Sequence, residues 1–147
     1  MGKVMGAAVR PGVLRRFPDW PERLTAFVES RRRTPFAWGA HDCALYAADA
    51  VLAITGVDLA ASYRGRYATA SGAFKALADA GVDTPEDAAA AALPRVALRQ
   101  ARRGDVISAE LAYGISIGIS LGDRAVFAAP KGHLIVPLKR CRWAYAV

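Results

Sequence analysis

The sequence predicts an α+β protein in which N-terminal helices are followed by an antiparallel β-sheet meander. Up to about residue 93, apolar residues recur at helical spacing between residues that favour helix ends. Beyond Pro94, apolar residues alternate with small or polar ones, and Gly-containing turns separate the alternating runs. The chain has 147 residues, of which 54% are hydrophobic, so it is large enough for one domain with a single core.

The first predicted helix covers residues 19–32. Residues 19–22 (Asp-Trp-Pro-Glu) resemble a capping box, and proline is tolerated in the first helical turn. The residues expected to face the core are Leu24, Phe27 and Val28. Gly and Pro punctuate residues 1–17, which we interpret as an N-terminal arm, so the predicted domain spans residues 18–147.

The second predicted helix, residues 43–55, is the central one. Asp42 is a strong N-cap residue, Gly56 is a typical C-terminal stop, and Gly39 allows a sharp turn just before the helix. Cys43 therefore falls on the first turn, where the helix dipole favours a thiolate. On spacing alone, its position favours a small buried residue that starts a core helix.

Two shorter helices are predicted next. Thr69 is expected to cap the third helix, with Phe74 and Leu77 facing inward and Gly81 at its end. Thr84 is expected to cap the fourth helix, which runs through an alanine-rich stretch to about residue 93.

The strands follow residue 94. Residues 103–107 lead into the first, and residues 114–121 form the second, with isoleucines on one face and Ser116, Gly118 and Ser120 on the other. A turn at residues 122–123 precedes a strand over residues 124–128. Further strands are expected over residues 133–138 and 143–147.

Charge and cysteine usage exclude several classes of protein. The net charge is +7, but the arginines are scattered and no nucleic-acid motif accompanies them, so we favour a solvated or partner-facing basic surface over a nucleic-acid partner. No apolar run is long enough to span a membrane, and no secretory signal is evident. Cys43 and Cys141 match no metal spacing, so we expect two reduced thiols, no metal and no cofactor.

Asp49 is the only charged residue within the second helix. We expect it to pair with an arginine from residues 63–67 (Tyr-Arg-Gly-Arg-Tyr), which is a structural role rather than a catalytic one.

A Trp-Gly stretch that leads to Asp-Cys at a helix start, followed by Gly-Asp-Val-Ile and a Gly-Ile-x-Leu-Gly strand, resembles the NlpC/P60 group of papain-like cysteine peptidases. The resemblance is closer to a phage and prophage branch with the motif Phe-x-Trp-Gly-x-x-Asp-Cys, then Ala-Asp in the helix, then Arg-Gly-Arg-Tyr. Here these residues are Phe36, Trp38, Gly39, Asp42, Cys43, Ala48, Asp49, Arg64, Gly65, Arg66 and Tyr67. The resemblance implies an NlpC/P60-like fold and a gene of the phage tail module.

The resemblance also indicates where catalysis would be carried out. Cys43 is the candidate nucleophile, and the position of the expected catalytic histidine is Ser116. The region where a polar residue would orient that histidine, residues 127–129, is apolar. Serine does not accept a proton near neutral pH as imidazole does, and we expect neither His41 nor His133 to replace it.

Two functions follow as alternatives. The preferred one is a structural or adaptor component of a phage tail tip or baseplate hub, or a tail assembly factor, whose partners are other tail proteins and whose location is the virion after assembly in the host cytoplasm. The alternative is an active peptidoglycan peptide hydrolase that uses Cys43 to aid DNA entry. Nucleic-acid binding is a weaker third reading.

Overall fold

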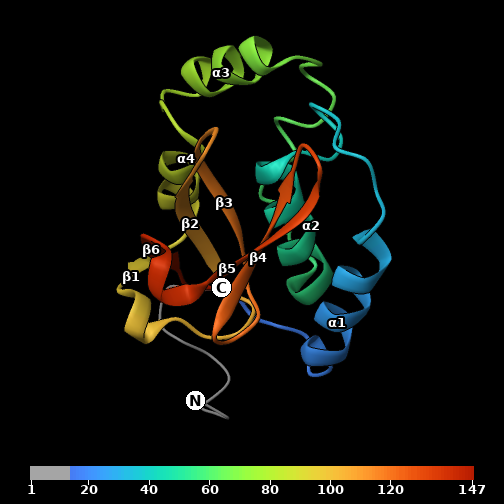
Figure 1. Cartoon of the computed structure of the whole chain (residues 1–147), viewed down its shortest axis with the longest axis vertical. Helices are drawn as coiled ribbons and strands as arrows, with labels where there is room; N and C mark the ends of the chain where they lie inside the picture. Colours follow the sequence, from blue (N-terminus) through green and yellow to red (C-terminus); the bar gives the residue numbers. More distant parts are fainter. Residues whose placement is uncertain (1–13) are drawn as a thin grey trace.

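The computed structural model describes residues 14–147, which form four α-helices and a six-stranded antiparallel sheet (Figure 1). The predicted α+β class is confirmed. The helices are α1 (Trp20–Arg31), α2 (Cys43–Thr55), α3 (Ala70–Asp79) and α4 (Pro85–Ala92). The strands are β1 (Arg95–Val96), β2 (Val106–Leu111), β3 (Gly114–Ser120), β4 (Arg124–Ala129), β5 (Gly132–Pro137) and β6 (Trp143–Tyr145). Two 3-10 turns, η2 (Leu98–Gln100) and η3 (Leu138–Arg140), complete the described part of the chain.

The strand order is β1-β6-β2-β3-β4-β5, so the predicted meander corresponds to β2 through β5. The last strand does not extend this meander: β6 returns to the free side of β2 and also pairs with β1. The pairing of β3 with β4 is short and joins Ile119 to Val126 and Ser120 to Ala125. Beyond these pairs the two hairpins β2–β3 and β4–β5 continue separately, which leaves the start of β3 free to meet α2.

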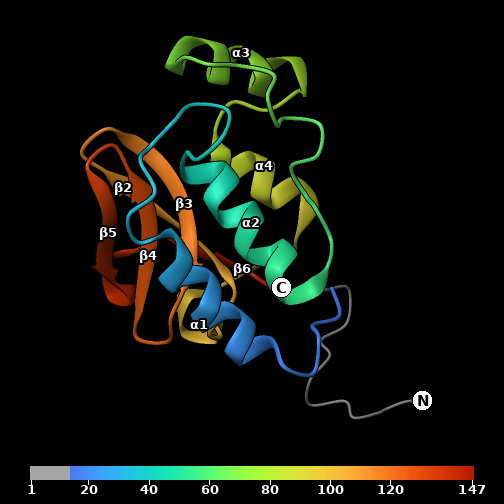
Figure 2. The ribbon, with the colours of Figure 1, turned by 90° about the vertical axis from the view of Figure 1, so that its right-hand side faces the viewer.

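The main core lies between α2 and the sheet. α1, α2 and α4 cover one face of the sheet, as Figure 2 shows. Fully buried members of this core include Leu24, Tyr46, Ile54, Ile119 and Val126. A second apolar cluster on the other face includes Ile107, Phe127 and Ala144, together with the partly buried Leu138 and Cys141 near η3. Because both faces are covered, Ser116, Gly118 and Ser120 are buried.

Local sequence signals predict most helix ends correctly. The side chains of Asp42, Thr69 and Thr84 each accept a hydrogen bond from a backbone N–H of the first turn, and Gly56 ends α2 with φ +79°. The expected capping box of α1 is wrong, because the Asp19 carboxylate binds Arg23 instead of a backbone N–H.

The predicted orientation of Phe74 is also wrong. Its side chain is 61% exposed, whereas Leu77 is buried as expected. In Figure 1, α3 lies apart from the sheet, above the N-terminal end of α2. Only the side of α3 that carries Ala73 and Leu77 lines the interior, so Phe74 points toward solvent.

The described end of the predicted arm is attached to the domain. The Phe17 N–H donates to the Ile54 carbonyl, and the Arg16 guanidinium binds the Asp105 carboxylate and the carbonyls of Arg103 and Val147. Residues 1–13 of that arm lie outside the described residues. Within residues 14–147, no helix has the length and apolar character needed to cross a bilayer.

Candidate active site

Cys43 is the first residue of α2, and Asp42 organises the turn that leads to it. One Asp42 carboxylate oxygen accepts a hydrogen bond from the Leu45 N–H at 3.0 Å. The other oxygen accepts from the Gly39 N–H at 3.0 Å and from the Tyr67 hydroxyl at 2.6 Å. The expected N-cap is therefore confirmed, and the same carboxylate also fixes the preceding turn and the segment around Tyr67.

The turn before Cys43 requires glycine. Gly39 has φ +80°, and a Cβ atom on it would overlap the backbone carbonyl oxygen of Tyr67. The Gly39 carbonyl in turn accepts a hydrogen bond from the Gly65 N–H. The Trp-Gly-x-x-Asp-Cys and Arg-Gly-Arg-Tyr segments thus pack against each other, although about 20 residues separate them in the sequence.

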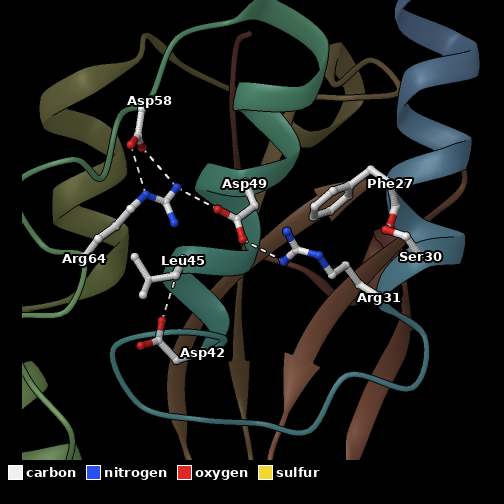
Figure 3. A network of polar contacts seen from close by, with 8 residues as sticks. All are labelled: Phe27, Ser30, Arg31, Asp42, Leu45, Asp49, Asp58 and Arg64. Carbon is white, nitrogen blue, oxygen red and sulfur yellow. Dashed lines mark hydrogen bonds and ion pairs between the residues drawn. The ribbon is translucent and has the colours of Figure 1, made fainter.

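The predicted pairing of Asp49 is confirmed (Figure 3). Arg64 binds one Asp49 oxygen at 2.6 Å, and Arg31 from the end of α1 binds the other at 2.7 Å. Arg64 also binds Asp58 with two hydrogen bonds of 3.0 Å, which lower the pKa of the Asp58 carboxyl. Asp49 therefore joins α1, α2 and residues 58–64. Arg66 is exposed and lines an open groove beside α3.

The surroundings of the Cys43 thiol do not favour a thiolate. Burial raises the pKa of this thiol above its ordinary value, and the Asp42 carboxylate adds to the increase. The Ile117 backbone and the Ser116 side chain act in the opposite direction but do not offset it. Burial therefore opposes the expected stabilisation of the thiolate by the helix terminus.

Ser116 on β3 thus lies near Cys43 on α2, close enough for its side chain to lower the pKa of the thiol. The two histidines lie elsewhere, around the ring of the fully buried Tyr46. The His41 and His133 rings contact that ring edge-on, with centroids 5.7 and 5.2 Å away. Burial lowers the pKa of both imidazoles. Neither histidine is among the main groups that act on the Cys43 thiol.

A small apolar pocket of about 60 Å³ opens beside Cys43. It lies between the start of α2, the inner side of α3 and the start of α4. Its lining residues include Trp38, Leu45, Tyr63, Tyr67 and Leu77. Trp38 is 37% exposed and packs edge-to-face against Phe36, so it forms part of the rim.

Sequence reasoning missed several residues of this site. Tyr67 had been noted only as part of a motif, and Arg31 and Asp58 had not been singled out. Tyr113 is 48% exposed in the β2–β3 turn; partial burial raises its pKa, and a nearby Cys43 thiolate adds to the increase. These contacts join residues that are distant in sequence, so no local pattern marks them.

The described residues contain no group of three or more His, Cys, Asp or Glu side chains suited to a metal ion. Both cysteines are free thiols, and burial raises the pKa of Cys141 to about 11.

This arrangement, with a cysteine at the start of a central helix packed on an antiparallel sheet, defines an NlpC/p60-like fold. The solved structure of the NlpC/p60 domain of the peptidoglycan hydrolase SagA matches 86% of this chain and 97% of its own, with a TM-score of 0.56 and 18% identity. That identity shows a shared fold alone. A family model described as "Domain of unknown function (DUF6950)" matches residues 15–147, so the chain belongs to this family. The comparison with curated proteins found no match.

Proposed function

We propose that this protein is a non-hydrolytic NlpC/P60-like domain that acts as a structural or adaptor component of a phage tail tip or baseplate hub, or as a factor that assembles one. The observation that carries the loss of hydrolysis is the set of groups near Cys43. The neighbouring β3 residue that acts on its thiol is Ser116, while both imidazoles pack around Tyr46.

The chemistry of Cys43 and Ser116 supports the proposal. A cysteine peptidase needs a thiolate together with a base that later protonates the leaving amine. Near neutral pH, a serine hydroxyl neither takes the proton from the thiol nor protonates the leaving amine. Because burial also raises the pKa of Cys43, the attacking form is scarce at that pH.

The phage role rests on the motif that joins Trp38, Gly39, Asp42 and Cys43 to residues 64–67. Asp42 and Gly39 both form hydrogen bonds with residues 65–67. This packing supports a structural role for the motif residues. In this proposal the partners are neighbouring tail-hub or tail-tip proteins, and the protein reaches the virion after assembly in the host cytoplasm.

The test uses the phage that carries this gene. Cys43→Ala is expected to leave tail assembly and infectivity close to the parent level, because no step requires the thiol. The matched control is Gly39→Val, which disturbs the same turn by overlapping Tyr67 and is expected to reduce incorporation. Normal tails that infect poorly with Cys43→Ala would contradict the proposal.

The N-terminal arm provides a separate test of the adaptor role. Residues 1–13 include Lys3 and Arg10 and no acidic residue. Their deletion retains Arg16 and Phe17, which hold the domain together, and is expected to impair incorporation into tails. Normal incorporation of the shortened protein would remove the arm as an interface.

The second candidate function is a peptidoglycan peptide hydrolase that uses Cys43. The apolar pocket beside the thiol favours it, because such a pocket can hold a substrate side chain. The similar fold of a domain from a peptidoglycan hydrolase is consistent with it. This candidate predicts that Cys43→Ala abolishes wall digestion without affecting tail assembly.

A further inference from the structure

β5 is one edge of the sheet, and in the described part of the chain β4 is its only neighbouring strand. Figure 2 shows β5 at the margin of the molecule, with the helices on the inner face of the sheet. An edge strand presents a row of backbone N–H and C=O groups that can pair with another strand. The outer edge of β5 can therefore accept an additional strand.

The middle of this edge is apolar. Leu134 is 38% exposed and Ile135 is 48% exposed. Consecutive residues of a strand point to opposite faces, so the edge offers one apolar side chain on each face. Their partners on β4, Phe127 and Val126, are fully buried, so the two exposed side chains continue the two apolar clusters outward.

Natural edge strands are commonly protected by lysine or proline. Here Lys131 precedes β5 and Pro137 ends it, but neither lies at the exposed centre. The unprotected centre is the part that a pairing strand would cover.

The ends of the edge are basic. Lys131 lies at one end, and Lys139 and Arg140 follow at the other, all exposed. Arg124, also exposed, pairs in register with Pro137. Asp123 is the acidic residue of the adjoining turn, so cations outnumber acids around β5. A partner segment therefore gains from acidic residues at its own ends.

The same charges argue against the two occupants that this chain itself could supply. Antiparallel pairing of two β5 strands would place Lys131 of one copy beside Lys139 of the other. Residues 1–13 carry Lys3 and Arg10 without an acidic residue. Both arrangements bring like charges together.

We propose that the free edge of β5 binds an extended segment of a partner protein by strand addition, and that this segment is apolar at its centre and acidic at its ends. Main-chain hydrogen bonds supply the affinity of such a complex, and side-chain contacts supply the selectivity. This inference goes beyond the proposed function, because it depends neither on the chemistry at Cys43 nor on a phage partner.

The test is an NMR titration of the ¹⁵N-labelled full chain with a short synthetic peptide that has alternating Thr and Val residues between two acidic pairs. Shift changes are expected at the β5 amides, together with slower exchange of their outward-facing N–H groups. A peptide with Lys in place of the acidic residues is expected to bind at least about tenfold more weakly at low salt, with a smaller difference at high salt.

Ile135→Glu is expected to weaken binding of the acidic peptide by about tenfold or more, since it replaces an apolar contact at the centre of the edge by a charge that repels acidic residues. The matched control is Val57→Glu, which makes the same change at another exposed apolar residue, after α2, and should leave binding unchanged. The proposal is overturned if β5 shows no shift changes, if the Lys-flanked peptide binds equally well, or if the chain forms a dimer that Ile135→Glu dissociates.

Discussion

Gly39 shows how a single residue holds the site together. It adopts φ +80°, and a side chain there would overlap the Tyr67 carbonyl. An L-residue in the left-handed conformation costs about 1–2 kcal/mol. We predict that Gly39→Ala lowers the free energy of unfolding by more than this cost. Urea denaturation measures the change.

Gly65 provides the matched control for that prediction. Its φ is +68°, but a Cβ atom on it would meet open space. Gly65→Ala should therefore show only the backbone cost, about 1–2 kcal/mol. Equal losses for the two variants would mean that the Tyr67 contact does not matter for stability.

The reactivity of Cys43 tests its environment. Because burial raises the pKa of the Cys43 thiol above its ordinary value, the thiolate should be a minor species at pH 7. In a Cys141→Ser background, we predict slow iodoacetamide alkylation at neutral pH and a rate that still rises above pH 9. A plateau below pH 8 would contradict this environment.

Ser116→His tests the assignment of Ser116 to the position of the missing base. An imidazole there should move the alkylation profile of Cys43 to lower pH, because an imidazolium favours the thiolate. Circular dichroism controls for folding, since Ser116 is buried. An unchanged alkylation profile in a folded variant would show that a side chain at position 116 does not contact the Cys43 thiol.

At the scale of elements, Asp49 connects α1, α2 and residues 58–64. Arg31 and Arg64, which are about one-third exposed, would lose their shared carboxylate in Asp49→Ala. Because breaking a buried pair costs about 3–5 kcal/mol and an exposed pair much less, we predict a loss of about 2 kcal/mol. Thermal or urea unfolding measures it.

The exposed pair of Asp19 with Arg23 is the control for that comparison. Asp19→Ala should produce no measurable change in stability, because solvent screens the pair and no helix cap is lost. A similar loss in both variants would indicate that helix α1, rather than the Asp49 junction, governs the effect.

The buried His41 and the partly buried His133 predict a pH dependence of stability. Burial lowers the pKa of His41 and His133 below 6.5, so the unfolded chain binds more protons than the folded chain as the pH falls below 6.5. Stability should therefore decrease with acidification from 6.5 toward the lower folded pKa values. In urea unfolding at several pH values, the free energy of unfolding should change less steeply with pH for the double variant His41→Phe, His133→Phe.

The sequence predicted the elements that depend on local signals. Asp42 and Gly56 mark the two ends of α2, because helix capping depends on a few neighbouring residues. The ion pair of Asp49 with an arginine was predictable because an isolated charge in an apolar helix requires an opposite charge. The sequence did not predict the exposure of Phe74 or the strand β1. The position of α3 and a two-residue strand both depend on tertiary packing.

The candidate site was predictable to a similar extent. The placement of Cys43 at the start of α2 followed from the motif, but its raised pKa did not, because desolvation comes from β3 and other distant segments. The same reason explains why the hydrogen bond between Tyr67 and Asp42 was missed.

At the scale of the whole molecule, Arg16 and Asp105 join the start of the described chain to β2 and to Val147. Asp105 is fully buried and also accepts hydrogen bonds from the N–H groups of Arg102 and Val147. Arg16→Ala would break this buried ion pair at the fully buried Asp105 carboxylate, so we predict a loss of stability of about 3–5 kcal/mol. Chemical denaturation measures it.

Arg102→Ala is the matched control, because the Arg102 side chain is exposed and only its backbone N–H binds Asp105. It should unfold like the parent protein. A loss for Arg102→Ala as large as that for Arg16→Ala would show that the buried ion pair is not the reason.

The central proposal is that this domain keeps an NlpC/p60-like fold without a base beside Cys43. Its most direct test is incubation of the purified chain with peptidoglycan sacculi, followed by chromatography of the released fragments. The account predicts no release above that of Cys43→Ala. Release of peptide fragments that stops when Cys43 is alkylated or replaced would contradict it.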